Sequence, residues 1–154
     1  MLTIVNGDLF SQNAECFVNP WNMNFIPWFL LVPHGVSGKL KKVAGYKPFN
    51  ELLKMGLLKP GSAVITNGGN LSQKIIHVAG LEWYWISTLK VVENCIRNAL
   101  LLAEKNNIKS IAFPLIGTGV GGLKEKDVLQ LMEKVASEKV WSINKIIVVK
   151  YQIS

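Results

Sequence analysis

The chain has 154 residues, a formal net charge of +7 from 17 Lys and Arg against 10 Asp and Glu, 49% apolar residues and two cysteines. This length is typical of one domain, and folding can bury about 68–70% of the surface of such an unfolded chain, so the core needs no disulfide or metal. The apolar content excludes intrinsic disorder. Two histidines and no CxxC pair exclude a structural zinc site. The positive charge is compatible with a polyanionic partner, nucleic acid included, but does not locate a site.

The sequence carries no targeting or membrane-spanning pattern. The N-terminal region contains Asp8 and no early Lys or Arg, so the positively charged start of a signal peptide is missing. The longest apolar run, Phe25 to Pro33, has half of the ~20 residues that a spanning helix needs and contains two prolines. We therefore expect a cytoplasmic protein without membrane contact, in which both cysteines are reduced.

Apolar runs alternate with amphipathic stretches along the whole chain, which predicts a single α/β domain over residues 1–154. In the first half of the chain the pattern predicts, in order, strands over Leu2 to Val5 and Cys16 to Asn19, helices over Val36 to Ala44 and Pro48 to Met55, and strands over Ser62 to Thr66 and Lys74 to Val78. In the second half it predicts a helix over Thr88 to Lys105, a strand over Ser110 to Ile116, a helix over Lys124 to Lys139 and a strand over Lys145 to Tyr151. Helices between strands predict a largely parallel sheet that is covered on both faces.

A glycine-rich turn follows the strand that begins at Ser110. It runs from Gly117 to Gly122 and contains four glycines before an amphipathic helix. Successive backbone N–H groups in such a turn, with a helix N-terminus behind them, form a concave phosphate-binding site. The alternative is a turn that only permits tight packing between strand and helix. We favour the phosphate site, because four glycines in six residues exceed what a turn needs.

Two common nucleotide-binding motifs do not explain this turn. Gly117, Gly119 and Gly122 match GxGxxG, but a dinucleotide-binding domain needs an acidic residue at the end of the next strand, about 20 residues on. That strand, residues 146–151, contains no acid. The Walker motif fails because no glycine precedes Gly38-Lys39 at the required spacing.

Five motifs in order resemble a macro domain, the ADP-ribose-binding module. They are Asn6-Gly-Asp-Leu9, Val18-Asn-Pro-Trp-Asn22, Gly35-Val-Ser-Gly38, Ile75-Ile-His-Val-Ala-Gly80 and Phe113-Pro-Leu-Ile-Gly-Thr-Gly-Val-Gly-Gly122. The resemblance covers nearly the whole chain. It implies a three-layer α/β/α fold with a mixed, mostly parallel sheet of about six strands.

The resemblance also implies a binding site for ADP-ribose or an ADP-ribosylated macromolecule, with no metal and no cofactor. Asp8 would accept a hydrogen bond from the adenine amino group, Asn22 would contact the distal ribose, and two glycine-rich segments would hold the pyrophosphate. The ligand-binding residues implied in this way are Asp8, Leu9, Asn19, Asn22, Asn24, Gly35, Val36, Ser37, Gly38, Gly117, Thr118, Gly119, Val120 and Gly121.

Catalysis is implied less directly. The family's branch that hydrolyses ADP-ribosyl esters often has Asp where this chain has Ser37. Asn22 and Ser37 would then position a water that the substrate phosphate polarises. His34 is a candidate general base, because an ordinary histidine pKa of about 6.5 suits proton transfer. A second branch uses a lysine and an acid, but its acid would fall at Gly121.

Two further departures concern aromatic side chains. The stretch between Asn22 and Gly35 is longer than in common members and rich in aromatic residues, and we expect it to pack down with Trp28 or Phe29 near the cleft. The aromatic that often covers the adenosine is Leu123 here. Tyr151 could replace it as a face for adenine, or it could be an amphipathic residue at a strand end.

The remaining polar and aromatic candidates have plainer interpretations. His77 lies in an apolar strand, which predicts a core histidine that holds a backbone group rather than a catalytic one. Trp83 and Trp85 are compatible with a core, a dimer surface or a lid. The lysines at positions 39, 41, 42 and 47 predict a solvated helix face, with nucleic-acid steering as the alternative.

The sequence thus supports two main hypotheses, and a third in which the aromatic stretch between Asn22 and Gly35 redirects the pocket to a different nucleotide or an RNA end. The first is an enzyme that binds ADP-ribose and hydrolyses an ADP-ribosyl linkage on protein, on nucleic acid or in O-acetyl-ADP-ribose. The second is a reader module that binds ADP-ribose or a related nucleotide without turnover, which the absence of an acid at Ser37 favours. The oligomeric state is not predicted.

Overall fold

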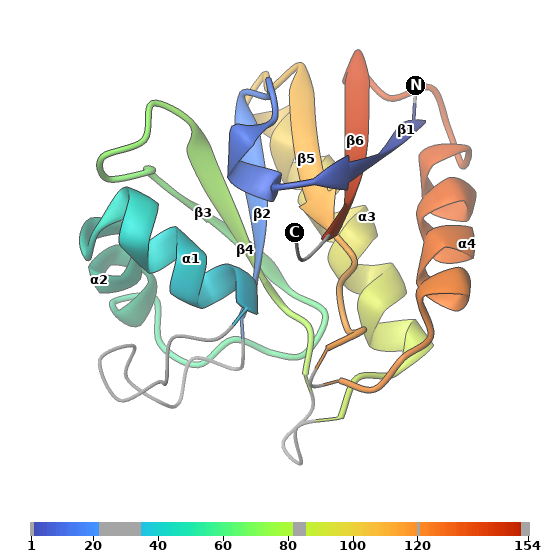
Figure 1. Ribbon diagram of the computed structural model, residues 1–154, viewed down its shortest axis with the longest axis horizontal. Helices are drawn as coiled ribbons and strands as arrows, with labels where there is room; N and C mark the ends of the chain where they lie inside the picture. The colour runs from blue at the N-terminus through green and yellow to red at the C-terminus, as the bar shows by residue number, and fades with distance from the viewer. Residues whose placement is uncertain (1, 22–34, 82–85, 120, 152–154) are drawn as a thin grey trace.

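Six strands form one sheet in the computed structural model, which describes residues 2–21, 35–81, 86–119 and 121–151 (Figure 1). They are β1 (Leu2–Gly7), β2 (Cys16–Trp21), β3 (Ala63–Thr66), β4 (Lys74–Ala79), β5 (Ser110–Pro114) and β6 (Lys145–Tyr151). Their spatial order is β1-β6-β5-β2-β4-β3. Neighbouring strands are parallel except β3, which is antiparallel to β4. The predicted mixed, mostly parallel sheet is confirmed.

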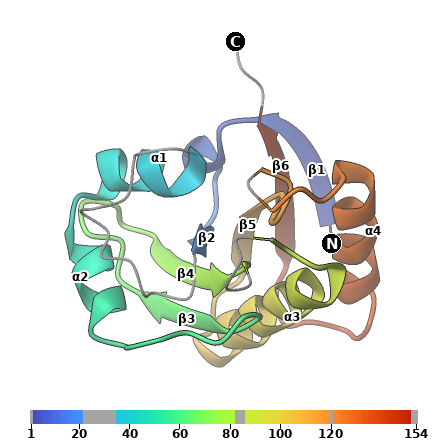
Figure 2. The ribbon, with the colours of Figure 1, turned by 90° about the horizontal axis from the view of Figure 1, so that it is seen from below.

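Helices cover both faces of the sheet. They are α1 (Gly35–Ala44), α2 (Lys47–Leu53), α3 (Leu89–Lys105) and α4 (Glu125–Ala136), and a short 3-10 helix, η1 (Leu9–Ser11), follows β1. The view from below shows α1 and α2 on one side of the sheet and α3 and α4 on the other (Figure 2). Two buried apolar clusters, one on each side of the sheet, form the core between these layers. The fold is therefore the expected three-layer α/β/α arrangement.

Local sequence explains where the long helices lie. The side chain of Thr88 accepts a hydrogen bond from the backbone N–H of Val91 at 3.2 Å and so caps α3. Within the predicted apolar stripe of α3, Val92, Cys95, Ala99 and Ala103 are completely buried, whereas Leu102 is only partly buried. A similar stripe on α4 is buried beside it.

Several predicted boundaries were wrong by two or three residues. Strand β5 ends at Pro114 rather than Ile116, because the chain turns there and Thr118 donates its hydroxyl proton to the Leu115 carbonyl at 2.8 Å. Helix α4 ends at Ala136 rather than Lys139. Strand β2 continues to Trp21, so the Asn-Pro-Trp sequence belongs to the strand. The 3-10 helix after β1 was not predicted.

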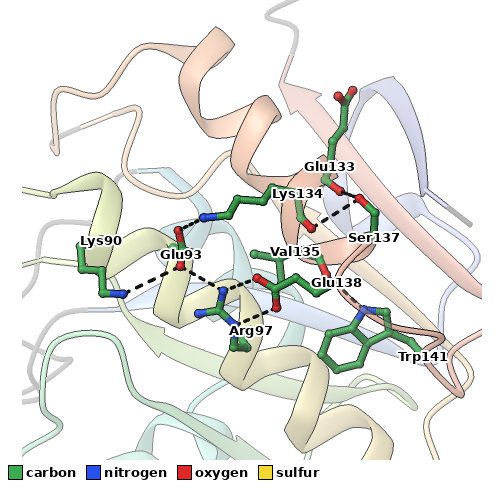
Figure 3. Close-up of polar contacts among 9 residues, drawn as sticks. All are labelled: Lys90, Glu93, Arg97, Glu133, Lys134, Val135, Ser137, Glu138 and Trp141. Carbon is green, nitrogen blue, oxygen red and sulfur yellow. Dashed lines mark hydrogen bonds and ion pairs between the residues drawn. The ribbon is translucent and has the colours of Figure 1, made fainter.

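An ion-pair cluster joins α3 to α4 on the outer surface (Figure 3). The carboxylate of Glu93, whose side chain is 14% exposed, lies 3.0 Å from Arg97 and 2.9 Å from Lys134. Arg97 also binds Glu138, beyond the end of α4. Hydrogen bonds from Lys134 and Arg97 lower the pKa of Glu93 from 4.5 to about 2. The cluster therefore holds α3 and α4 together.

Glu93→Gln is expected to lower the free energy of unfolding at neutral pH by about 1 kcal/mol, as for other surface ion pairs. Because the folded-state pKa of Glu93 is depressed, its stabilisation is complete above pH 4.5 and is lost as pH falls towards 2. Urea unfolding from pH 7 to pH 3 should therefore show a flatter pH dependence for the variant. Lys90→Gln is the control, because Lys90 lies 3.9 Å from Glu93 and is 75% exposed. A pH dependence identical to wild type in Glu93→Gln would contradict this account.

Candidate functional site

A large cleft opens at the carboxyl ends of the parallel strands. Its volume is about 1120 Å³, and residues from the ends of β1, β2, β5 and β6 contribute to its walls. The chain leaves β2 towards α1 on one face of the sheet and leaves β5 towards α4 on the other (Figures 1 and 2). β2 and β5 are neighbours, so the cleft lies where the direction of winding reverses. Open α/β sheets bind their ligands at this position.

The first glycine-rich segment, Gly35 to Gly38, starts α1 and lines the cleft. Backbone N–H groups in the first turn of a helix have no partner within the helix, and the helix dipole adds positive potential there. Gly35 has φ +60°, a left-handed conformation that glycine adopts without strain. This segment is therefore suited to hold an anionic group.

The second glycine-rich segment, Gly117 to Gly121, lies on the same cleft. The backbone N–H of Leu123 donates to the Gly117 carbonyl at 2.9 Å and closes the turn. A Cβ added at Gly121 would lie 2.5 Å from Ser87 Oγ and 2.6 Å from the Gly117 oxygen. Only glycine fits at that buried position, and the exposed Gly119 presents backbone without a side chain to the cleft. The structure thus brings together two backbone segments that are far apart in the sequence.

Charged side chains of both signs line the cleft, with a small excess of lysines among the described residues. Lys39, Lys41 and Lys42 of α1 line it, and the carboxylates among its described lining residues are Asp8 and Glu125. Asp8 Oδ1 lies 2.5 Å from Lys39 Nζ, which compensates the charge of Asp8. Among the described lining residues, lysines outnumber carboxylates by one, which is compatible with an anionic ligand such as a phosphate ester.

A hydrogen-bonded chain of polar side chains starts at Ser37 on the cleft. Ser37 Oγ lies 2.9 Å from Asn19 Oδ1 and 2.9 Å from the Pro20 carbonyl oxygen. Asn19 Nδ2 lies 3.0 Å from His77 Nδ1, and His77 Nε2 lies 2.9 Å from Thr66 Oγ1. Asn19 and His77 are completely buried. The chain connects α1, β2, β4 and β3 beneath the cleft.

Burial lowers the pKa of His77 from 6.5 to about 3, so its imidazole is neutral at physiological pH. It does not line the cleft and cannot serve as a base for a bound ligand. Its predicted position in the core is confirmed. The expectation that it holds a backbone group is wrong, because its two nitrogens contact the side chains of Asn19 and Thr66.

Most of the residues implied by the sequence lie together. Those that line the cleft are Asp8, Leu9, Gly35, Val36, Ser37, Gly38, Gly117, Thr118, Gly119, Gly121 and Tyr151. Tyr151 is 69% exposed at the end of β6. Asn19 differs, since its buried amide lies beneath Ser37 and is absent from the lining. Outside the described residues lie Asn22, Asn24, Trp28, Phe29, His34, Trp83, Trp85 and Val120.

Sequence reasoning missed two groups of lining residues. The first is aromatic: Trp21 and Phe49 line the cleft, with ring centroids 5.4 Å apart. The position of Trp21 two residues after Asn19 could have indicated this wall. The second is Ser87, which is buried beside Gly121 and donates its hydroxyl proton to the Gly80 carbonyl. No local pattern distinguishes this serine from others.

Two further properties concern the described residues alone. Their His, Cys, Asp and Glu side chains form no group of three or more that could hold a metal ion. None of the helices seen in these segments has the length and apolar character needed to cross a bilayer.

Comparison with known proteins identifies the family. The model of the macro domain family matches residues 18–132. A Salmonella newport protein named O-acetyl-ADP-ribose deacetylase is 33% identical over 144 residues, which cover 89% of this chain and 78% of that protein. A Klebsiella pneumoniae protein of the same name is 31% identical and covers 83% of this chain and 74% of its own length.

Solved structures agree with this result. A glycine-to-valine mutant of the Oceanobacillus iheyensis macrodomain with ADPR superposes with a TM-score of 0.82 and 28% identity, over 97% of this chain and 84% of that chain. A Trypanosoma brucei macrodomain, at 22% identity, has the same fold with a TM-score of 0.83, over 99% of this chain and 64% of that chain. The chain belongs to the macro domain family.

Proposed function

We propose that the cleft binds ADP-ribose and that the protein hydrolyses an ADP-ribosyl ester, with O-acetyl-ADP-ribose as the first substrate to test. The observation that carries the proposal is the convergence of two glycine-rich segments, 35–38 and 117–121, on one cleft. Such segments suit a pyrophosphate, because backbone N–H groups can bind it from both sides. Relatives named O-acetyl-ADP-ribose deacetylase support the choice of substrate.

The ligand would lie along the carboxyl edge of the sheet. Asp8 would accept a hydrogen bond from the adenine amino group at one end, with Tyr151 beside the base. The distal ribose would lie over Ser37 at the start of α1. Hydrolysis would add water across the ester, giving acetate and ADP-ribose, with Ser37 and Asn22 orienting the water. Linkages to protein or nucleic acid are further substrates of the same chemistry.

A second candidate function is binding without turnover. Its supporting observation is the position of the carboxylates among the described lining residues. Asp8 lies between β1 and η1, and Glu125 lies at the start of α4, whereas Ser37 lies at the start of α1. His77, which approaches Ser37 through Asn19, is neutral and buried. Clear ADP-ribose binding without hydrolysis of acetylated, protein-linked or DNA-linked substrates would establish this reader function.

Ser37→Ala is expected to lower kcat for O-acetyl-ADP-ribose about tenfold, because it removes one hydrogen bond that orients the water. The dissociation constant of ADP-ribose should change less than kcat does, since the glycine segments remain. Single-turnover kinetics and titration calorimetry separate the two quantities. Ser72→Ala is the matched control, because Ser72 is exposed and lies outside the cleft. An unchanged kcat in Ser37→Ala would contradict the proposed role.

Asp8→Ala is expected to weaken ADP-ribose binding about tenfold, through loss of a hydrogen bond to a charged group. The loss should be smaller for the hypoxanthine counterpart of ADP-ribose, which has no amino group to donate. Calorimetric titration of both ligands measures the difference. Lys39→Met controls for the loss of the ion pair between Asp8 and Lys39. Equal losses for both ligands would show that Asp8 does not recognise the adenine amino group.

A further inference from the structure

The buried chain of hydrogen bonds from Ser37 to Thr66 determines whether the Ser37 hydroxyl faces the ligand as a hydrogen-bond donor or as an acceptor. Ser37 lines the cleft, but its hydroxyl has two acceptors inside the protein, Asn19 Oδ1 and the Pro20 carbonyl oxygen, each at 2.9 Å. A hydroxyl has one proton and two lone pairs. Once the proton is directed inward, the hydroxyl can only accept hydrogen bonds from the cleft.

The structure orients the Asn19 amide with its oxygen towards Ser37 and its nitrogen towards His77, and the protons along the chain can be placed to match this orientation. At the far end, Thr66 Oγ1 lies 2.9 Å from the Asn67 carbonyl oxygen, so the threonine proton is used there. The contact of 2.9 Å between Thr66 Oγ1 and His77 Nε2 then needs its proton on the histidine. A neutral imidazole with its proton on Nε2 has a lone pair on Nδ1.

That lone pair fixes the next two contacts. His77 Nδ1 accepts from the Asn19 amide nitrogen at 3.0 Å, which leaves the amide oxygen pointing to Ser37. With the amide reversed, the Asn19 nitrogen would donate to Ser37 Oγ and occupy one of its lone pairs, and Thr66 would donate to His77 instead of to the Asn67 oxygen. Within the described residues, no buried side-chain nitrogen or oxygen lacks a hydrogen-bond partner.

We propose that Asn19, His77 and Thr66 are positioning residues that keep the Asn19 oxygen, and not its NH2 group, against Ser37, so that neither lone pair of Ser37 Oγ is used inside the protein and Ser37 accepts a hydrogen bond from an O–H group in the cleft. This inference rests on the proposed function. The O–H donor is the water that attacks the ester, or a hydroxyl group of the distal sugar. As a hydrogen-bond acceptor, Ser37 Oγ would orient a water molecule with one proton towards Ser37 and a lone pair towards the reacting carbon. A carboxylate, which is also an acceptor, is suited to the same task.

The test is the pair Thr66→Val and Thr66→Ser. Valine has nearly the shape of threonine but cannot accept from His77, so the imidazole proton is expected to move to Nδ1. The Asn19 amide must then reverse, and its nitrogen occupies a lone pair of Ser37. Serine keeps the acceptor and is expected to behave as wild type. The ¹⁵N NMR spectrum of histidine-labelled protein reports the tautomer directly, and His77→Gln assigns the signal between the two histidines of the chain.

The expected result is an Nε2–H tautomer in wild type and Thr66→Ser, and an Nδ1–H tautomer in Thr66→Val with kcat reduced about fivefold. A reduced kcat with constant ADP-ribose affinity assigns the O–H donor to the water, and a reduced affinity assigns it to the sugar. An Nδ1–H tautomer in wild type would overturn the inference. A tautomer change in Thr66→Val that alters neither kcat nor the ADP-ribose affinity would also overturn the inference. If wild type binds ADP-ribose without turnover, the proposed hydrolysis fails, while the tautomers and affinities still decide the inference.

Discussion

Replacing Gly119 with leucine is expected to weaken ADP-ribose binding at least about 100-fold while the protein remains folded. Gly119 lines the cleft between the two ends of the second glycine segment. A Cβ added there has no heavy atom within 4 Å, and its φ lies outside the left-handed region. The backbone therefore tolerates a side chain, and the space that the side chain fills is the space proposed for the ligand. Titration calorimetry measures the affinity.

The neighbouring glycines make less informative targets. Gly35 and Gly117 have φ of +60° and +83°, so any side chain strains the backbone there. Gly121 has Ser87 and the Gly117 carbonyl against it. Loss of binding in those variants would combine blocked space with altered structure. Gly119→Ala is the matched control and should retain most of the affinity. An unchanged melting temperature together with wild-type affinity in Gly119→Leu would show that ligand does not approach this turn.

His77→Leu is expected to lower the free energy of unfolding by about 2 to 4 kcal/mol, which corresponds to a decrease in melting temperature of roughly 5–15 °C. The imidazole has two polar partners in a completely buried position. Leucine leaves the Asn19 amide proton and a lone pair of Thr66 without partners, and each such group carries a desolvation cost. Urea unfolding at pH 7 measures the loss.

A double-mutant cycle separates the loss of hydrogen-bond partners from poor packing of the leucine side chain. Replacing both hydrogen-bonding partners by apolar groups removes the unsatisfied atom, so Thr66→Val should cost less in the His77→Leu background than in wild type. The pH dependence is a second check. The pKa of His77 falls from 6.5 to about 3 on folding, so its stabilisation is complete above pH 6.5 and is lost towards pH 3. His77→Leu should lack this component. Additive effects in the cycle would contradict the account.

The fold was largely predictable from hydrophobic patterning. The alternation of strands with amphipathic helices gave all six strands and four helices of the described residues within a few positions. The stripe at 91–103 has a helical period, and the buried runs at 75–79 and 146–149 have the length and β-branched content of strands. The errors lie at element ends, where single hydrogen bonds such as that from Thr118 to Leu115 decide the boundary.

The parts of the site that consist of backbone, the two glycine-rich segments, were predictable from the sequence. Glycine-rich segments are visible in a sequence, and their meeting at one cleft follows from the parallel sheet. Side-chain pairings across the fold leave no such pattern. The ion pair of Asp8 with Lys39, the contact of Ser87 with the second glycine segment and the chain from Ser37 to Thr66 each join distant parts of the sequence. For this reason Asn19 was expected at the ligand, whereas its amide lies beneath Ser37.

Isothermal titration with ADP-ribose, AMP and NAD tests the central claim most directly. The account predicts ADP-ribose binding with a dissociation constant on the order of micromolar, and much weaker binding of AMP, which lacks the pyrophosphate and the distal ribose that the two glycine segments would hold. Absence of ADP-ribose binding, or equal affinity for AMP, would contradict the account and would mean that this cleft serves a different ligand.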